Sequence, residues 1–115
     1  MANLPDKVQI GPISFQVKEV DDLHTTDDDG KKKWLHGHIL YADATIKVAS
    51  DQVEDMKVAT IWHEALHGLM DQAGMDEHPE AIIRMLGYGL VRLIRDNPTL
   101  VQATIGEKVG SSSGE

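Results

Sequence analysis

The stretch TIWHEALHGLMDQAG, residues 60–74, is the part of the sequence on which both the fold and the function depend. Apolar residues recur through it at helical spacing, and Gly74 is a natural end for a helix. The predicted helix contains the pattern His63-Glu64-x-x-His67. Because residues i and i+4 lie on one face of a helix, both imidazoles can direct a nitrogen at one metal ion roughly 2 Å away. Glu64 lies about 100° around the helix from His63, so it flanks such an ion and is free to accept a proton from water there.

The helix around this motif favours a metal site over a chance arrangement. In a chain of this composition the pattern arises by chance on the order of 0.02 times. Trp62, Leu66 and Leu69 are the residues expected to hold the helix against the core. The competing interpretation is a surface helix with two solvated histidines and one solvated glutamate. Catalytic zinc would also need a third protein ligand and an open fourth position.

The third ligand is expected downstream of the motif. Asp71 lies one turn past His67 on the same helix, and three ligands do not easily converge from one helical stripe, so we interpret it as a partner that orients a ligand or as a solvated carboxylate. Glu80 begins the next predicted helix, and its side chain can reach back if the two helices pack antiparallel. Glu80 is therefore the expected third ligand and His78 is the runner-up, with Glu77 or no third ligand as the remaining possibilities.

The first half of the chain predicts a small antiparallel sheet of about three strands. ISFQVKEV, residues 13–20, alternates apolar and polar side chains as a half-buried strand does. An Asp-Gly pair within residues 24–33 supplies the positive φ angles of a tight hairpin turn. Two further short strands are expected within residues 34–41 and 45–49, separated by an Ala-Asp-Ala turn.

The second half predicts two packed helices. Asp51 and Glu54 have the spacing of a capping box before the first helix, and Pro79 suits the first turn of the second. The apolar face expected on the second helix comprises Ile82, Ile83, Leu86, Leu90, Leu93 and Ile94. We therefore expect one α+β domain over residues 1–98, followed by a Gly/Ser-rich and partly disordered tail over residues 99–115.

The composition restricts the class of function. The chain has 115 residues and 41% hydrophobic residues, which suits one small domain with one core. It has no cysteine, which excludes disulfides, thiolate zinc sites and cysteine nucleophiles. A net charge of -8 opposes sequence-independent binding to nucleic acid, which requires a basic surface. Because neither a secretory signal nor an apolar run of roughly 20 residues is visible, we expect a cytoplasmic protein without a membrane span.

The segment WHEALHGLMDQAG followed by DEHPEAIIRMLGYGLVRLIRDNP resembles small phage and prophage zincin-like proteins, which are similar to minimal zinc metallopeptidases of the glutamate-ligand type. The resemblance covers residues 34–98 and is strongest over the two predicted helices. It implies a minimal zincin-like fold, Zn²⁺ as cofactor and, for a phage-encoded protein, a place in the host cell cytoplasm. The family motif corresponds to His63, Glu64 and His67, and its downstream acidic position to Glu80.

Two departures from the family pattern concern the cleft. The spacing between His67 and Glu80 is short, and no obvious oxyanion-stabilising residue follows the third ligand. Tyr41 and Tyr88 are candidates for that role, and the sequence does not distinguish them. Arg84, one turn after Glu80, is expected either to orient its carboxylate or to form an ordinary surface pair.

The sequence predicts a zinc-dependent hydrolase, and first a peptidase, acting on a peptide or protein substrate. His63, His67 and Glu80 would hold Zn²⁺, and Glu64 would activate water and pass its proton to the leaving amine. An edge strand within residues 34–41 would pair with the extended substrate. The alternative is a zinc-stabilised binding module of phage origin without catalysis, which the small size favours and the presence of a non-ligand glutamate opposes. A metal-free helical interaction domain is the third hypothesis.

Overall fold

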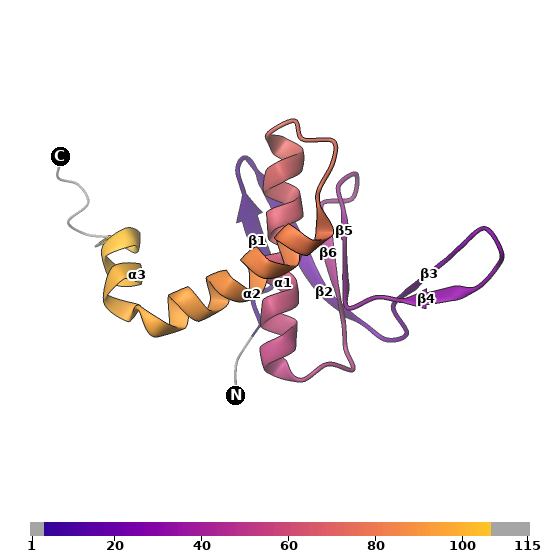
Figure 1. The fold of residues 1–115 in the computed structure, drawn as a ribbon, viewed down its shortest axis with the longest axis horizontal. Coiled ribbons are helices and arrows are strands. Elements are labelled where there is room, and N and C mark those ends of the chain that lie inside the picture. The colour runs from indigo at the N-terminus through magenta and orange to yellow at the C-terminus, as the bar shows by residue number, and fades with distance from the viewer. Residues whose placement is uncertain (1–3, 107–115) are drawn as a thin grey trace.

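The computed structural model describes residues 4–106 and confirms the predicted α+β class. Its strands form a sheet and a separate hairpin, and its helices follow in the second half of the chain (Figure 1). The elements in chain order are β1 (Lys7–Ile10), β2 (Ile13–Val20), β3 (His24–Thr26), β4 (Lys32–Trp34), β5 (Gly37–Leu40), β6 (Thr45–Ala49), α1 (Glu54–Gln72), α2 (Glu80–Asp96) and α3 (Pro98–Ile105).

The main sheet is mixed rather than antiparallel. Its strand order is β1-β2-β6-β5, in which β2 and β6 are parallel and the two outer pairs are antiparallel. β6 lies inside the sheet, where Ile46 and Val48 are fully buried. The predicted antiparallel sheet of three strands is therefore wrong in both strand number and strand direction. The physical reason is that β3, β4 and β5 intervene between β2 and β6, and this length of chain lets β6 return in the direction of β2.

The strand β1 was not expected from the sequence. It pairs antiparallel with β2, and Ile10 lies opposite Ile13 across the turn. In that turn Gly11 has a φ of +56°, a conformation that glycine adopts without the steric cost of a side chain. The sequence signal is the Gly-Pro pair between the apolar segments KVQI and ISFQ, because glycine at the first central position is typical of a two-residue hairpin turn.

The predicted hairpin within residues 24–33 is present as a separate two-stranded sheet of β3 and β4, which extends from the main body in Figure 1. In its turn, Gly30 has a φ of +83° whereas Asp29 has a negative φ, so the pair does not form the tight turn expected. Instead, the Asp27 carboxylate accepts hydrogen bonds from the backbone N–H groups of Asp29 and Lys31. The result is a longer turn closed by an aspartate side chain.

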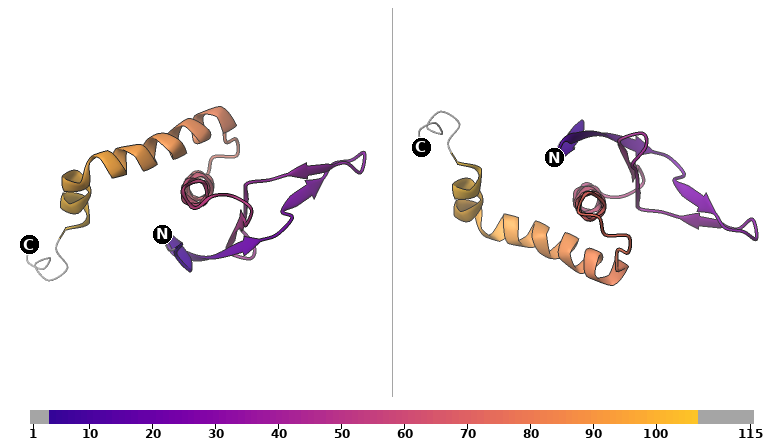
Figure 2. Two further views of the ribbon diagram at one scale, coloured as in Figure 1. Left: turned by 90° about the horizontal axis from the view of Figure 1, so that it is seen from below. Right: turned by 90° about the horizontal axis from the view of Figure 1, so that it is seen from above.

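Helix α1 is the middle layer of the molecule. Figure 2 shows it end-on, with the sheet on one side and α2 on the other. Ile61 and Ala65 of α1 join the buried core formed with the sheet. Gly68 lets the helix lie close to the strands, because a Cβ there would be 2.9 Å from Cδ1 of Ile10 and 3.2 Å from Cδ1 of Ile39.

Several apolar residues expected in the core are exposed. Trp62 and Leu69 of α1 have 38% and 52% of their surface exposed. Ile82, Leu86 and Leu93 of α2 are also exposed, because α2 packs along one stripe against α1 and contacts no strand of the sheet. The buried residues of α2 are Ile83, Gly87 and Val91.

Two helix boundaries differ from the prediction. Helix α1 begins at Glu54 after Val53, and no side chain caps it, so the expected capping box with Asp51 does not form. Residues 98–105 form α3 where a tail was predicted, because Pro98 ends one helix and suits the first turn of the next. The rest of the predicted tail, residues 107–115, lies outside the described residues. Between residues 4 and 106, no helix is long and apolar enough to cross a membrane.

Candidate metal centre

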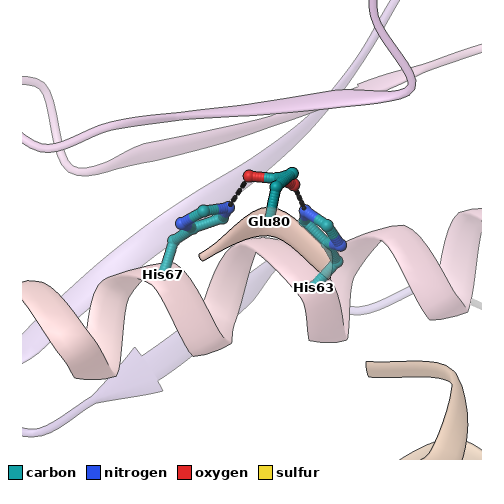
Figure 3. Close-up of side chains that lie close together, drawn as sticks. All are labelled: His63, His67 and Glu80. Carbon is teal, nitrogen blue, oxygen red and sulfur yellow. Dashed lines mark ion pairs between the residues drawn. The ribbon is translucent and has the colours of Figure 1, made fainter. Parts of the chain in front are cut away.

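Three of the predicted site residues meet between α1 and α2. His63 and His67 lie one turn apart on α1, with ring centroids 5.1 Å apart. Glu80, the first residue of α2, places its carboxylate between the two imidazoles (Figure 3). Its Oε1 is 2.6 Å from Nε2 of His63, and its Oε2 is 3.2 Å from Nε2 of His67. One ligand atom from each residue lies within 4.8 Å of the others, so this group could hold a metal ion.

The turn between α1 and α2 brings Glu80 to this position. Gly74 has a φ of +82°, and the backbone N–H of Met75 donates a hydrogen bond to the carbonyl of Met70. This arrangement is a Schellman motif, which ends α1 and redirects the chain. Pro79 is the N-cap residue of α2, so Glu80 stands at the start of the helix with its side chain toward α1.

The crossing of the two helices holds this end of α2 in place. A Cβ at Gly87 would lie 3.5 Å from the Cα of His63, so the two backbones come close there. Ile83, one turn before Gly87, is fully buried. The position of Glu80 relative to His63 therefore depends on helix packing as well as on the connecting turn.

The geometry of the three residues fits zinc. Imidazole nitrogens and carboxylate oxygens are common zinc ligands, and two ligands of a tetrahedral ion lie roughly 3.3 Å apart. The separation of 3.2 Å between Nε2 of His67 and Oε2 of Glu80 matches that spacing. The 2.6 Å between Nε2 of His63 and Oε1 of Glu80 is a short hydrogen-bond distance, and this contact has to lengthen to admit an ion.

The electrostatics of the group also suit a cation. Burial lowers the pKa of His67, although the charge of Glu80 acts in the opposite direction. Burial acts to raise the pKa of Glu80, but the charges of His67 and His63 and their hydrogen bonds outweigh it, and the net shift is downward. Neutral imidazole and ionised carboxylate are the forms that bind a metal.

Glu64 is a buried carboxyl beside this group. It is 7% exposed, and its Cγ lies at the contact between α1 and β5. Burial raises the pKa of Glu64 to about 7, the charge of Glu80 adds to the rise, and a hydrogen bond from the backbone of Ile39 opposes it. A carboxyl with this pKa can both accept and donate a proton at neutral pH.

His78 and Asp71 lie outside the ligand group. Nδ1 of His78 is 2.8 Å from Nδ1 of His67, and Nε2 of His78 is 2.9 Å from the carbonyl oxygen of Met75. Both ring nitrogens of His78 are therefore engaged, one with the far nitrogen of the His67 ring and one with the Met75 carbonyl, and His78 is not one of the converging ligands. Asp71, expected as an orienting partner or a solvated carboxylate, is exposed.

Burial raises the pKa of Tyr41, and the charge of Asp71 adds to that rise.

A cleft of about 460 Å³ opens beside the group, between the β4–β5 segment and the two longer helices. Arg84 and Tyr88 of α2 line it, whereas the ion pairs of Glu80 are with histidines rather than with Arg84. Trp34 and Lys33 also line it and were not singled out from the sequence. Both residues belong to β4, and their place in the cleft depends on how the folded chain sets the β4–β5 segment opposite the helices.

Gly37 lets β5 approach α1 at the cleft, so the variant Gly37→Ala is expected to lose stability. A Cβ there would overlap Cγ2 of Thr60 and lie 3.2 Å from the Lys47 carbonyl oxygen. Overpacking of this kind lowers the free energy of unfolding by about 1–3 kcal/mol, which urea denaturation measures. The control is Gly89→Ala in α2, where nothing lies within 4 Å of the added Cβ, and helix propensity predicts a gain of up to about 1 kcal/mol. Equal stability of the two variants would contradict the close contact.

A scan of protein-family models, a search of curated proteins and a search of solved structures each found no significant match to this chain.

Proposed function

We propose that this chain is a zinc-dependent hydrolase that cleaves peptide bonds. The observation that carries the proposal is the buried Glu64 carboxyl. Glu64 lies on α1 next to His63, on the side of the helix that faces the sheet, and it is not one of the three converging ligands. A structural zinc site takes four protein ligands and needs no additional carboxyl, whereas a hydrolytic site takes three and keeps a base beside them. We also propose that the fold is a minimal zincin-like arrangement, which the edge strand beside the HExxH helix supports.

In the proposed mechanism, Glu64 moves the proton. Zinc held by His63, His67 and Glu80 would lower the pKa of a water molecule toward 7 and would polarise the scissile carbonyl. Glu64 accepts a proton from the attacking water and delivers it to the nitrogen of the leaving amine. A pKa raised to about 7 suits a group that must accept and then release a proton in one cycle. The surrounding burial keeps the carboxyl oriented and limits its access to bulk water.

The free edge of β5 supports an extended peptide as the substrate. β5 is the last strand of the sheet, and it borders the cleft. The backbone N–H of Ala49 donates to the carbonyl of His36, so these two residues form a hydrogen-bonded pair of the antiparallel ladder. Because such pairs alternate along an antiparallel ladder, Gly37 and Ile39 direct their backbone groups away from β6. The N–H of Ile39 there donates to the Glu64 carboxylate, and the N–H and carbonyl of Gly37 and the carbonyl of Ile39 can extend the sheet onto a substrate backbone.

Metal content and cleavage, measured on one preparation, test this proposal. The protein is purified without added metal, and bound zinc is measured by mass spectrometry. It is then incubated with a peptide library made by tryptic digestion of a proteome, and new termini are identified. We expect one zinc ion per chain and cleavage that a chelator abolishes and added zinc restores. A wild-type chain that binds no zinc would refute the metal centre.

A zinc-stabilised binding module is the second candidate. The observation in its favour is that α2 is attached to the rest of the molecule along a narrow stripe in which Ile83, Gly87 and Val91 are the buried residues. A metal ion shared by α1 and α2 would strengthen that attachment, because its binding free energy becomes folding free energy. Stoichiometric zinc without cleavage of any library peptide favours this candidate over the hydrolase.

A further inference from the structure

A chain of hydrogen bonds leads from the α1–α2 turn to His67. It begins at the carbonyl of Met75, the residue whose N–H completes the Schellman motif at the end of α1. Nε2 of His78 lies 2.9 Å from that carbonyl oxygen. Nδ1 of His78 lies 2.8 Å from Nδ1 of His67, and Nε2 of His67 faces Glu80 at 3.2 Å. The anchor is backbone that the turn holds in place, so the chain of contacts has a defined origin.

The chemistry of these atoms sets the position of each proton. A carbonyl oxygen only accepts hydrogen bonds, so Nε2 of His78 must carry the proton that it shares with Met75. In a neutral imidazole the other nitrogen is then an acceptor, and Nδ1 of His67 must donate to it. A neutral His67 protonated at Nδ1 presents an unprotonated Nε2. That nitrogen lies 3.2 Å from Oε2 of Glu80, so either a proton or a metal ion between the two atoms removes the repulsion of two acceptors.

We propose that His78 is a positioning residue that selects the Nδ1-protonated tautomer of His67 and thereby presents Nε2 of His67 to the metal. This inference rests on the proposed metal centre, and it assigns His78 a different role from that of a ligand. Partners of this kind orient a metal-binding imidazole and raise its basicity, and their loss weakens metal affinity by roughly 10- to 100-fold. Here the partner is a second histidine supplied by the connecting turn rather than by α1 itself.

The test compares His78→Leu, which lacks an acceptor, with His78→Asn, whose amide oxygen can accept from Nδ1 of His67. Zinc affinity is measured by competition with a chromophoric chelator, and the imidazole tautomers are read from ¹⁵N chemical shifts. We expect His78→Leu to bind zinc roughly 10- to 100-fold more weakly and to lose the Nδ1-protonated form of metal-free His67. His78→Asn should recover most of both properties. His24→Leu, in β3, is the matched control and should bind as the wild type does.

The outcomes separate this inference from the metal centre. A wild type that binds no zinc overturns both. A wild type that binds zinc, with His78→Leu of equal affinity, overturns the role of His78 alone. Equal losses in the Leu and Asn variants also overturn it, because they would show that the hydrogen-bond acceptor is not what matters. The thermal midpoint of each metal-free variant is expected to match that of the wild type, and a lower midpoint in parallel with lower affinity would indicate a structural role instead.

Discussion

Replacing His63 with alanine is expected to abolish the stabilisation of this protein by zinc. An ion that binds the folded chain but not the unfolded chain adds about 4 kcal/mol at a free concentration 1,000 times its Kd. For a domain of this size, that corresponds to a rise in Tm of roughly 16 °C or more. His63→Ala removes one of the three donors that converge within 4.8 Å, and zinc should then leave the Tm unchanged. Thermal unfolding followed by circular dichroism, with and without zinc, measures the difference.

The control for this prediction is His24→Ala, a histidine of the β3–β4 hairpin. It should keep the full zinc-dependent rise in Tm. Without metal, His63→Ala should melt close to the wild type, because the carboxylate that His63 contacts belongs to the half-exposed Glu80. An undiminished response to zinc in His63→Ala would show that the ion binds elsewhere and would contradict the proposed ligand group.

The parts of the site that were predictable from the sequence depend on local spacing. His63 and His67 share a helix face because they are four residues apart, and no tertiary contact is needed to place them together. Glu80 could be anticipated because the turn is short and glutamate stands at the start of the next helix. β2 was predicted with the bounds that the structure shows, because its alternation is unbroken from Ile13 to Val20.

The parts that were not predictable depend on long-range packing. The parallel pairing of β2 with β6 joins segments separated by a hairpin and another strand, and alternation alone does not specify strand direction. Trp62 and Leu69 have helical spacing, but their exposure depends on how much of α1 the neighbouring layers cover. The contact between His67 and His78 depends on how the turn is folded, so the sequence indicated only that His78 was near the site.

Replacing Glu64 with glutamine is expected to abolish hydrolysis while zinc binding is retained. Glutamine has the shape of glutamate but cannot accept the proton, and general acid–base catalysis of this kind contributes about 10²- to 10⁴-fold to the rate. The kcat/KM of the variant should therefore be at least two orders of magnitude below that of the wild type for any library peptide that the wild type cleaves. The variant should still bind one zinc ion per chain. Loss of zinc together with activity would instead make Glu64 a ligand or a structural residue.

The same substitution should stabilise the metal-free protein above neutral pH. The pKa of Glu64 is raised to about 7 in the folded chain, against an ordinary value near 4.5. Between these values the folded chain binds a proton that the unfolded chain has released, so the contribution of Glu64 to stability decreases as the pH rises and levels off above pH 7. A difference of this size corresponds to about 3 kcal/mol. Glu64→Gln removes this dependence, so it should exceed the wild type by about that amount at pH 8 and by little at pH 4.

Urea denaturation of the chelator-treated protein from pH 4 to pH 8 measures this difference. Asp28→Asn, at an exposed carboxylate in the β3–β4 turn, is the control and should follow the wild type across this range. A wild type and a Glu64→Gln variant with parallel stability profiles would mean that Glu64 ionises as an exposed glutamate does. A Glu64→Gln variant that is more stable but inactive would instead show that the wild type loses stability by keeping an ionisable carboxyl beside the metal ligands. A catalytic base requires such a carboxyl, and a structural metal site does not.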